Sequence, residues 1–282
     1  MTLNLLTVNI GAPSENRARR QLEWLAARTD HVVVLTETKG TTGSRLLADA
    51  YAAAGFAVTF PDHPHGELGV MIVSSVAVEP DPISDVMAYL PARLTGVRIN
   101  TSNGPIRVLG AYVPSRDGSM EKTERKRRWI ATFHDSFEAT VRDDPDTPVV
   151  LLGDLNVLEP QHQPPHRGQF APFEYAFYTD LTKRHGLHDL YRRRHPDGTD
   201  HSWARRPELG YRYDHAHASA SLDSVIDTCV YVHETRVAAS DGTRLTDHSG
   251  LAVSMTLTAN RPLLTSAPTA ATSQGDLGFT LF

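Results

Sequence analysis

The sequence predicts an α/β fold in which two mixed β-sheets pack together and helices lie outside them. Short apolar segments alternate with amphipathic segments along the chain, and hairpin-like pairs of strands occur among the helices. This mixture argues against a simple doubly wound parallel sheet. The 282 residues, of which 40% are hydrophobic, are enough for one large domain with a substantial core.

The first half of the chain begins with a strand over residues 3–10. Ser14 can cap a helix that runs to about residue 28, and the apolar run 31–39 predicts a buried strand with Glu37 near its carboxyl end. The elements expected next are a helix over 44–54, a hairpin of strands 56–60 and 68–74, and a second hairpin of strands 93–100 and 105–113.

The clearest helix covers residues 119–142. Trp129, Phe133 and Phe137 recur every four residues and form its inner face. The basic run from Lys122 to Arg128 in its first half is typical of a solvated helix face, although a phosphate-binding surface is the alternative.

A short buried strand follows Pro148 and ends in polar residues. Gly153 allows a turn or a close approach of the backbone, and Asp154 and Asn156 come directly after it. In an extended segment these two side chains would share one face and suit a metal ion, a water or a phosphate. The alternative is that Asp154 starts a turn and Asn156 caps a helix.

The second half contains several short elements. We expect a loop over 158–172, helices over 173–185 and 187–194, strands over 200–205, 211–218, 224–233 and 250–257, and a polar loop over 245–248. The expected division is a catalytic domain over 1–258 and a flexible tail over 259–282 that ends in apolar residues. That end either docks on its own domain, frays, or binds a protein partner.

Charge and cysteine content restrict the class of protein. The net charge of −5 is unlike that of a protein that coats nucleic acid, and the single cysteine, Cys229, cannot form an intrachain disulfide. No apolar run is long enough to span a bilayer, and the N-terminus lacks the pattern of a signal peptide. We therefore expect a cytoplasmic protein with no membrane association.

Eight polar residues end strands or lie in the loops after them: Asn9, Glu37, Tyr112, Asp154, Asn156, Asp214, Asp247 and His248. Carboxylates, amides, a phenol and an imidazole suit Mg²⁺-assisted attack of water on a phosphate ester. Hard oxygen ligands favour Mg²⁺ or Mn²⁺ over zinc.

Seven short motifs in the same order resemble the endonuclease/exonuclease/phosphatase family, most closely its exonuclease III and AP-endonuclease branch. They lie at residues 7–9, 35–39, 69–72, 110–114, 153–156, 211–214 and 246–248, and the resemblance spans about 3–258. The resemblance implies a four-layer α/β/β/α sandwich with its site at one end of the two sheets.

The resemblance also implies a role for each site residue. Glu37 binds the divalent metal, with Asp247 and Asn9 near it. Asp154 orients or deprotonates the attacking water, and Asn156 holds that water or a phosphate oxygen. Tyr112 hydrogen-bonds the phosphate or assists the leaving group, and His248, oriented by Asp214, contacts the phosphate. One-metal and two-metal mechanisms both stay open.

The sequence departs from that branch at three places. Gly11 stands where the branch has Asn or Asp, Val8 where an aromatic residue is common, and His215 to His217 where the strand is more apolar. These departures bear on DNA-repair specificity more than on phosphoester hydrolysis. Arg116 is a candidate replacement phosphate contact, and Trp203 is a candidate for stacking on a sugar or base, with a core or rim position as its alternative.

The substrate is left open between DNA and a small phosphoester. Basic segments at 17–20, 122–128 and 192–194 favour a DNA endonuclease or exonuclease of AP-endonuclease type, whereas the negative charge and Gly11 favour a nucleotide, sugar or lipid phosphate. A non-catalytic binding module is the alternative of another class. Zinc binding by paired histidines at 63 and 65, 162 and 166, or 215 and 217 is a further alternative, although their spacing is not consistent.

Overall fold

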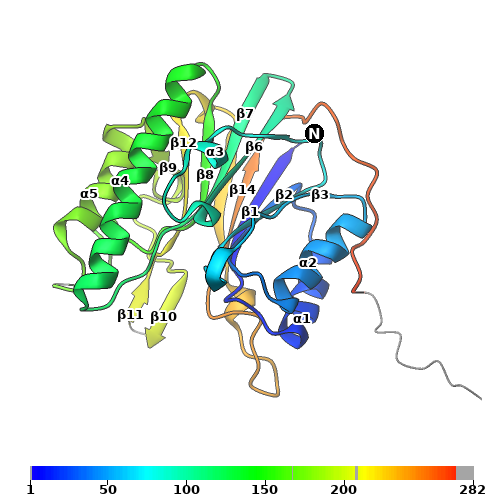
Figure 1. The fold of residues 1–282 in the computed structure, drawn as a ribbon, viewed down its shortest axis with the longest axis horizontal. Coiled ribbons are helices and arrows are strands. Elements are labelled where there is room, and N and C mark those ends of the chain that lie inside the picture. The colour runs from blue at the N-terminus through cyan, green and yellow to red at the C-terminus, as the bar shows by residue number, and fades with distance from the viewer. Residues whose placement is uncertain (1, 167, 207–208, 271–282) are drawn as a thin grey trace, which may run out of the picture.

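The computed structural model describes residues 2–166, 168–206 and 209–270. Its two six-stranded sheets face each other, and helices cover the outer side of each (Figure 1). The predicted α/β sandwich of two mixed sheets is confirmed.

The first sheet has the strand order β13-β14-β1-β2-β4-β3. The only parallel pair among its described strands is β1 with β2, joined through helix α1. Its elements are β1 (Leu3–Asn9), α1 (Glu15–Ala26), β2 (Val32–Thr38), α2 (Thr42–Ala53), β3 (Ala57–Thr59), β4 (Gly69–Ser74), β13 (Ile226–Val232) and β14 (Gly250–Met255).

The second sheet has the order β5-β6-β7-β8-β12-β9, and β7 with β8 is its parallel pair, joined through α4. Its elements are β5 (Glu79–Pro80), β6 (Leu94–Thr101), β7 (Gly104–Tyr112), α4 (Met120–Asp143), β8 (Val149–Asp154), α5 (Pro172–Lys183), β9 (Leu187–Asp189), α6 (Leu190–Arg194) and β12 (Asp214–Ser219). A separate hairpin pairs β10 (Trp203–Arg206) with β11 (Leu209–Tyr211). The short helical turns are α3 (Ile83–Val86), η1 (Pro64–Gly66), η2 (Pro91–Arg93), η3 (Ala220–Leu222) and η4 (His233–Arg236).

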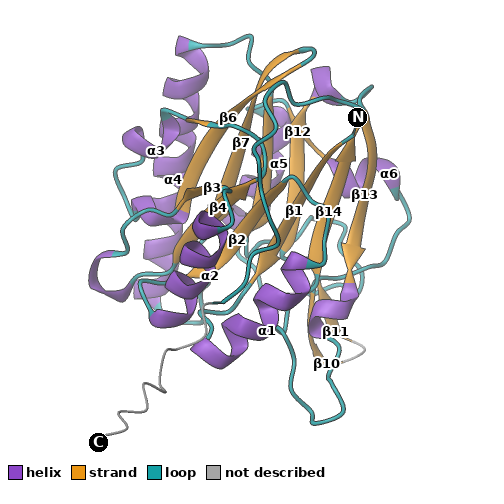
Figure 2. Ribbon diagram, turned by 90° about the vertical axis from the view of Figure 1, so that its right-hand side faces the viewer, coloured by secondary structure: helices purple, strands orange, loops and turns teal. Residues whose placement is uncertain are grey.

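Three apolar cores hold the four layers together. The central core lies between the sheets, a second core packs α1 and α2 on the first sheet, and a third packs α4 and α5 on the second. In Figure 2 the helices are seen on the outer sides of the strands. Gly110 lets the sheets approach closely, since a Cβ there would lie 2.6 Å from Val70 Cγ1 and 2.8 Å from Val34 Cγ1.

Two predicted elements differ from the structure. The alternating stretch 211–218 is two strands, because the chain leaves β11 and enters the second sheet after Arg212, whose side chain turns inward to buried carboxylates. The expected helix over 187–194 begins as β9, which adds an edge strand beside β12, and becomes helical only at Leu190.

The segment after β14 lies against the domain as far as residue 270. Leu263 N donates to Ser75 O and Ser266 N donates to Ala54 O, each at 2.9 Å. Residues 263 and 266 thus contact the domain, whereas the apolar end whose docking was left open lies in 271–282, outside the described residues. The division at residue 258 stays a prediction. Among the described residues no helix is long and apolar enough to cross a membrane.

Candidate active site

Strand directions bring the predicted polar residues to one edge of the sandwich. The parallel strands β1, β2, β7 and β8 end there, and the antiparallel strands β12 and β14 begin there. Within the second sheet Tyr112 pairs with Asp154, which in turn pairs with Asp214. The fold therefore places side chains from distant parts of the sequence around one pocket of about 340 Å³.

Asp154 is the buried carboxylate at the centre of this edge. Asn9 Nδ2 donates to its Oδ2 and the Asn156 backbone N–H donates to its Oδ1, both at 2.9 Å. Burial, followed by the nearby Asp214 carboxylate, raises the pKa of Asp154 to about 8. A bound cation or the neighbouring imidazolium favours its ionised form.

Gly153 makes this position possible. Its φ is +144°, and a Cβ there would lie 2.0 Å from the carbonyl oxygen of Ala111. The glycine predicted to permit close approach of the backbone does so against strand β7.

Of the two alternatives for this segment, the structure shows the turn that starts at Asp154, and Asn156 is not extended. Its φ is +50°, because Asp154 forms a turn through the Asn156 N–H and the Asn156 side-chain Nδ2 donates to Val113 O at 3.0 Å. Both side chains nevertheless line the same pocket.

His248 and Asp214 form the expected carboxylate–imidazole pair. The distance between His248 Nδ1 and Asp214 Oδ2 is 2.7 Å, and both residues are buried. Burial alone would lower the pKa of His248, but Asp214 outweighs it and raises this pKa to about 10. His248 is therefore an imidazolium at neutral pH, with Nδ1–H donating to Asp214.

Tyr112 and Glu37 form a second pair in the same region. The Tyr112 hydroxyl donates to Glu37 Oε1 at 2.9 Å, and the Arg93 guanidinium lies 4.6 Å from the centroid of the Tyr112 ring. Burial and then the Glu37 carboxylate hold the pKa of Tyr112 well above its usual value, so this phenol stays protonated. Glu37 has a φ of +53° at an irregularity in the pairing of β2 with β4.

The other predicted residues differ in how they meet the pocket. Asp247 lines it and accepts a hydrogen bond from Trp203 Nε1 at 2.8 Å. Asn9 is fully buried; its Nδ2 holds Asp154, and its Oδ1 accepts from Gly11 N at 2.9 Å. Asn9 thus contacts Asp154 directly, while its role as a metal ligand stays a prediction.

Arg116 is held by an acidic residue that the sequence did not reveal. Its Nε donates to Glu174 Oε2 at 2.7 Å, and Lys126 Nζ donates to Glu174 Oε1 at 2.7 Å and to Asn156 O at 2.6 Å. Lys126 is only 1% exposed, so the expectation of a solvated face is wrong for this member of the basic run. Its position three residues before Trp129, on the inner face of α4, was the available signal.

Aromatic side chains form another wall of the pocket. Trp203 and Tyr211 have ring centroids 5.3 Å apart, and those of Tyr211 and Tyr213 are 5.1 Å apart. Phe170 and Arg205 also line the pocket. This wall offers flat surfaces on which a sugar or base can stack.

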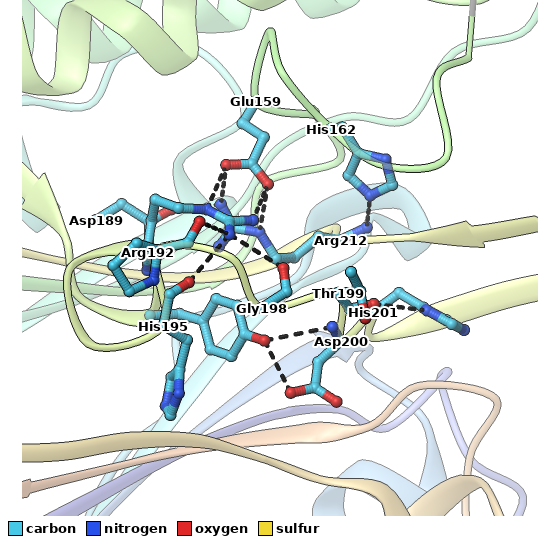
Figure 3. A network of polar contacts seen from close by, with 12 residues as sticks. Glu159, His162, Asp189, Arg192, His195, Gly198, Thr199, Asp200, His201 and Arg212 are labelled. Atoms are coloured by element: carbon cyan, nitrogen blue, oxygen red, sulfur yellow. Dashed lines mark hydrogen bonds and ion pairs between the residues drawn. The ribbon is translucent and has the colours of Figure 1, made fainter.

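A buried network of ion pairs holds the chain segments next to the site (Figure 3). This network was not anticipated from the sequence. Arg212 Nε donates to Glu159 Oε1 at 3.2 Å, and Arg212 Nη2 donates to Asp189 Oδ2 at 2.6 Å. Arg192 Nη2 also donates to Glu159, at 2.6 Å. The network therefore ties the loop after Asn156 to the residues just before Asp214.

The histidines of β12 do not border the pocket. His215 and His217 are fully buried on the face of the strand opposite to Asp214, and neither lines the pocket. Burial lowers the pKa of His217 to about 4, so it is neutral. Burial opposes ionisation of Asp189, but Arg212 holds its pKa well below the usual value.

The donor set at the pocket fits a hard divalent cation. Glu37, Asp154 and Asp247 supply carboxylate oxygens, and ligand atoms of Asp154, Asp214 and His248 lie within 4.8 Å of one another. Asp214 Oδ1 is buried without a hydrogen-bond partner among the described residues. Oxygen donors without cysteine suit Mg²⁺ or Mn²⁺.

The site combines acidic groups, an imidazolium and a protonated phenol. A metal-dependent phosphoester hydrolase uses this combination of groups. The model of the endonuclease/exonuclease/phosphatase family matches residues 1–248, so the chain belongs to this family. No curated protein sequence matches the chain.

Several solved structures that are similar to the chain are described as nucleases or phosphatases. The 3′ phosphatase NExo from Neisseria, bound to a product DNA hairpin, is 22% identical over 89% of this chain and 98% of its own, with a TM-score of 0.70. An AP endonuclease from Archaeoglobus fulgidus is 24% identical over the same shares, also with a TM-score of 0.70. The AP endonuclease LMAP from Leishmania major is 18% identical over 90% of this chain and 87% of its own, with a TM-score of 0.69. At these identities the similarity establishes the fold.

Proposed function

We propose that this enzyme hydrolyses phosphodiester bonds in DNA with the help of Mg²⁺, as an endonuclease or exonuclease of AP-endonuclease type. The observation that carries the proposal is the placement of Asp154 beside the Asp214–His248 pair, in a pocket that also contains Glu37 and an aromatic wall. The nuclease neighbours support DNA as the substrate.

Each group has a distinct task in this mechanism. Glu37 and Asp247 would hold the metal, which supplies positive charge to a phosphate oxygen when it is bound. Asp154, held by Asn9 and by the Asn156 N–H, orients and deprotonates the attacking water. His248 presents a fixed positive charge to the phosphate because Asp214 keeps it protonated.

Tyr112 and the aromatic wall complete the site. The phenol of Tyr112 stays protonated because its pKa is held high, and it can donate to the phosphate or to the leaving oxygen when its hydrogen leaves Glu37 Oε1. Trp203, whose indole N–H is held by Asp247, presents a ring next to the carboxylates. Arg116 is already paired with Glu174, so we assign it to shaping the pocket and not to a free phosphate contact.

A duplex with one abasic-site analogue, the same duplex intact and a panel of small phosphoesters test the proposal, each with Mg²⁺ and with EDTA. We expect Mg²⁺-dependent cleavage of DNA, with affinity that falls steeply as salt rises because phosphate contacts release counterions. Asp154→Asn should abolish cleavage, whereas Asp144→Asn, which alters an ion pair with Arg107 at the opposite edge of the sheet, should retain it. Turnover of a small ester alone would refute the DNA substrate and leave the hydrolase class intact.

A further inference from the structure

A second group of potential metal ligands lies on the other face of strand β12. His217 pairs in register with Asp189 across β12 and β9, and His215 lies two residues earlier on the same face. Asp189 Oδ2 is 3.6 Å from His215 Nδ1 and 3.9 Å from His217 Nε2. All three ligand atoms lie within 4.8 Å of one another, and both imidazoles are fully buried.

Backbone carbonyls fix the tautomer of each histidine. His215 Nε2 lies 3.1 Å from Val157 O, and His217 Nδ1 lies 3.4 Å from Leu187 O. A carbonyl oxygen only accepts, so each ring carries a hydrogen on the nitrogen that faces its carbonyl. The other nitrogens, His215 Nδ1 and His217 Nε2, therefore face Asp189, and that of the neutral His217 carries a lone pair.

Neither of these two nitrogens has a hydrogen-bond partner among the described residues. The carboxylate they face is itself an acceptor. It receives hydrogen bonds at Oδ2 from the Tyr178 hydroxyl at 2.8 Å and from Arg212 Nη2 at 2.6 Å. Three potential ligand atoms therefore converge on one buried point. An electron-pair acceptor or a hydrogen donor between them would satisfy the unpartnered nitrogens.

We propose that Asp189, His215 and His217 form a transition-metal site that takes Zn²⁺ with a water as its fourth ligand, separate from the pocket that holds the catalytic cation. Two imidazoles and one carboxylate suit Zn²⁺ and not Mg²⁺. With bonds of about 2.0–2.1 Å, a tetrahedral ion needs ligand atoms roughly 3.3–3.4 Å apart. The separations from Asp189 need to shrink by only a few tenths of an ångström.

The residues around this cluster make the outer contacts that are typical of a metal site, but their charges limit its affinity for the ion. Hydrogen bonds from the histidines to carbonyls, and from Tyr178 to Asp189, are the outer contacts that orient metal ligands. For the carboxylate to bind the ion, Arg212 must shift from Asp189 to Glu159, which it already contacts at 3.2 Å. Asp189 and Glu159 only balance Arg192 and Arg212, so the two charges of the ion are not compensated. We accordingly expect the site to bind the ion more weakly than a thiolate site does.

A buried water is the alternative to a metal ion between these three atoms. Such a water would donate one hydrogen to each imidazole nitrogen. Co²⁺ distinguishes the two, because a tetrahedral site with nitrogen ligands gives strong absorption in the visible range and an octahedral oxygen site gives little. The experiment titrates protein purified without a His-tag with Co²⁺ while Mg²⁺ saturates the catalytic pocket. We expect one equivalent of tetrahedral Co²⁺, displaced by Zn²⁺.

Two variants test whether the absorbing Co²⁺ ion is bound by these histidines. His217→Gln should abolish the tetrahedral spectrum, whereas Asp154→Asn, on the opposite face of the sheet, should leave it unchanged. Because His217→Gln can also destabilise the core, the nitrogen chemical shifts of His215 and His217 in the wild-type protein are measured with and without Zn²⁺. Absence of a tetrahedral spectrum, or nitrogen shifts that do not respond to Zn²⁺, would overturn the proposal and leave water as the occupant. Neither result depends on whether DNA is the substrate.

Discussion

Replacement of Lys126 by methionine tests the buried ion pair beneath the pocket. Met keeps most of the length of the lysine side chain but removes its charge. Lys126 and Glu174 are each 1% exposed, and Lys126 Nζ also supplies a hydrogen bond to the carbonyl of Asn156. The variant therefore leaves one buried carboxylate with fewer partners and one carbonyl without its donor.

The expected loss of stability follows from these two changes. Removal of one partner of a buried ion pair costs about 3–5 kcal/mol, and Glu174 keeps Arg116 at 2.6 Å, so the lower end applies. The lost hydrogen bond at Asn156 adds about 1 kcal/mol. A total of roughly 4 kcal/mol corresponds to a fall in Tm of roughly 8–16 °C for a domain of this size.

Urea and thermal unfolding measure this cost, and Lys122→Met on the same helix is the matched control. Lys122 is 55% exposed and pairs with Asp117 on the surface, so its loss should change stability by less than about 1 kcal/mol. The double variant Lys126→Met/Glu174→Gln should lose less than the sum of the two single variants. Equal costs for Lys126→Met and Lys122→Met would refute the argument that the buried lysine stabilises the base of the pocket.

Three further predictions follow from the site and its support. Asp154→Ala and His248→Ala should each lower kcat by at least about 100-fold with the fold retained, as checked by steady-state kinetics and circular dichroism; turnover like the wild type would contradict their roles. Gly153→Ala should destabilise the domain by more than about 3 kcal/mol in urea unfolding, because its Cβ would lie 2.0 Å from a carbonyl oxygen of β7 at a φ of +144°. His134 and His185 lie 2.7 Å apart, and burial lowers both pKa values, that of His185 to about 4. Above pH 6.5 these neutral histidines cost no folding stability. As the pH falls toward 4, roughly 1–2 kcal/mol of stability should be lost, because the unfolded state binds the protons first. A urea midpoint that stays unchanged over this pH range would contradict the prediction.

Much of the fold could be predicted from the sequence because local patterns determine it. The apolar runs that became β2 and β8 need burial on both faces, and the stripe of Trp129, Phe133 and Phe137 needs a partner surface. The strand ends then place Glu37 and Asp154 at one edge without any further information.

The supporting contacts could not be predicted in the same way, because they join residues far apart in the sequence. Nothing in the local pattern pairs Lys126 with Glu174 or Arg212 with Glu159 and Asp189. Each is an ion pair formed only after the layers have assembled. A charged residue in an otherwise helical or stranded pattern is ordinarily assigned to solvent, which is wrong for these two cations.

The buried Lys126 also contacts a residue at the pocket whose backbone conformation is unfavourable. Glu37 and Asn156 both adopt a left-handed backbone with φ near +50°. This conformation costs most non-glycine residues about 1–3 kcal/mol, and asparagine less. Each is held there by tertiary contacts, Glu37 by the Tyr112 hydroxyl and Asn156 by Val113 and Lys126. If the strain serves to aim the two side chains, Lys126→Met should lower kcat as well as stability, since Asn156 loses its restraint, while Lys122→Met should change neither. A variant that unfolds more readily but turns over at the rate of the wild type would show that Lys126 serves the fold alone.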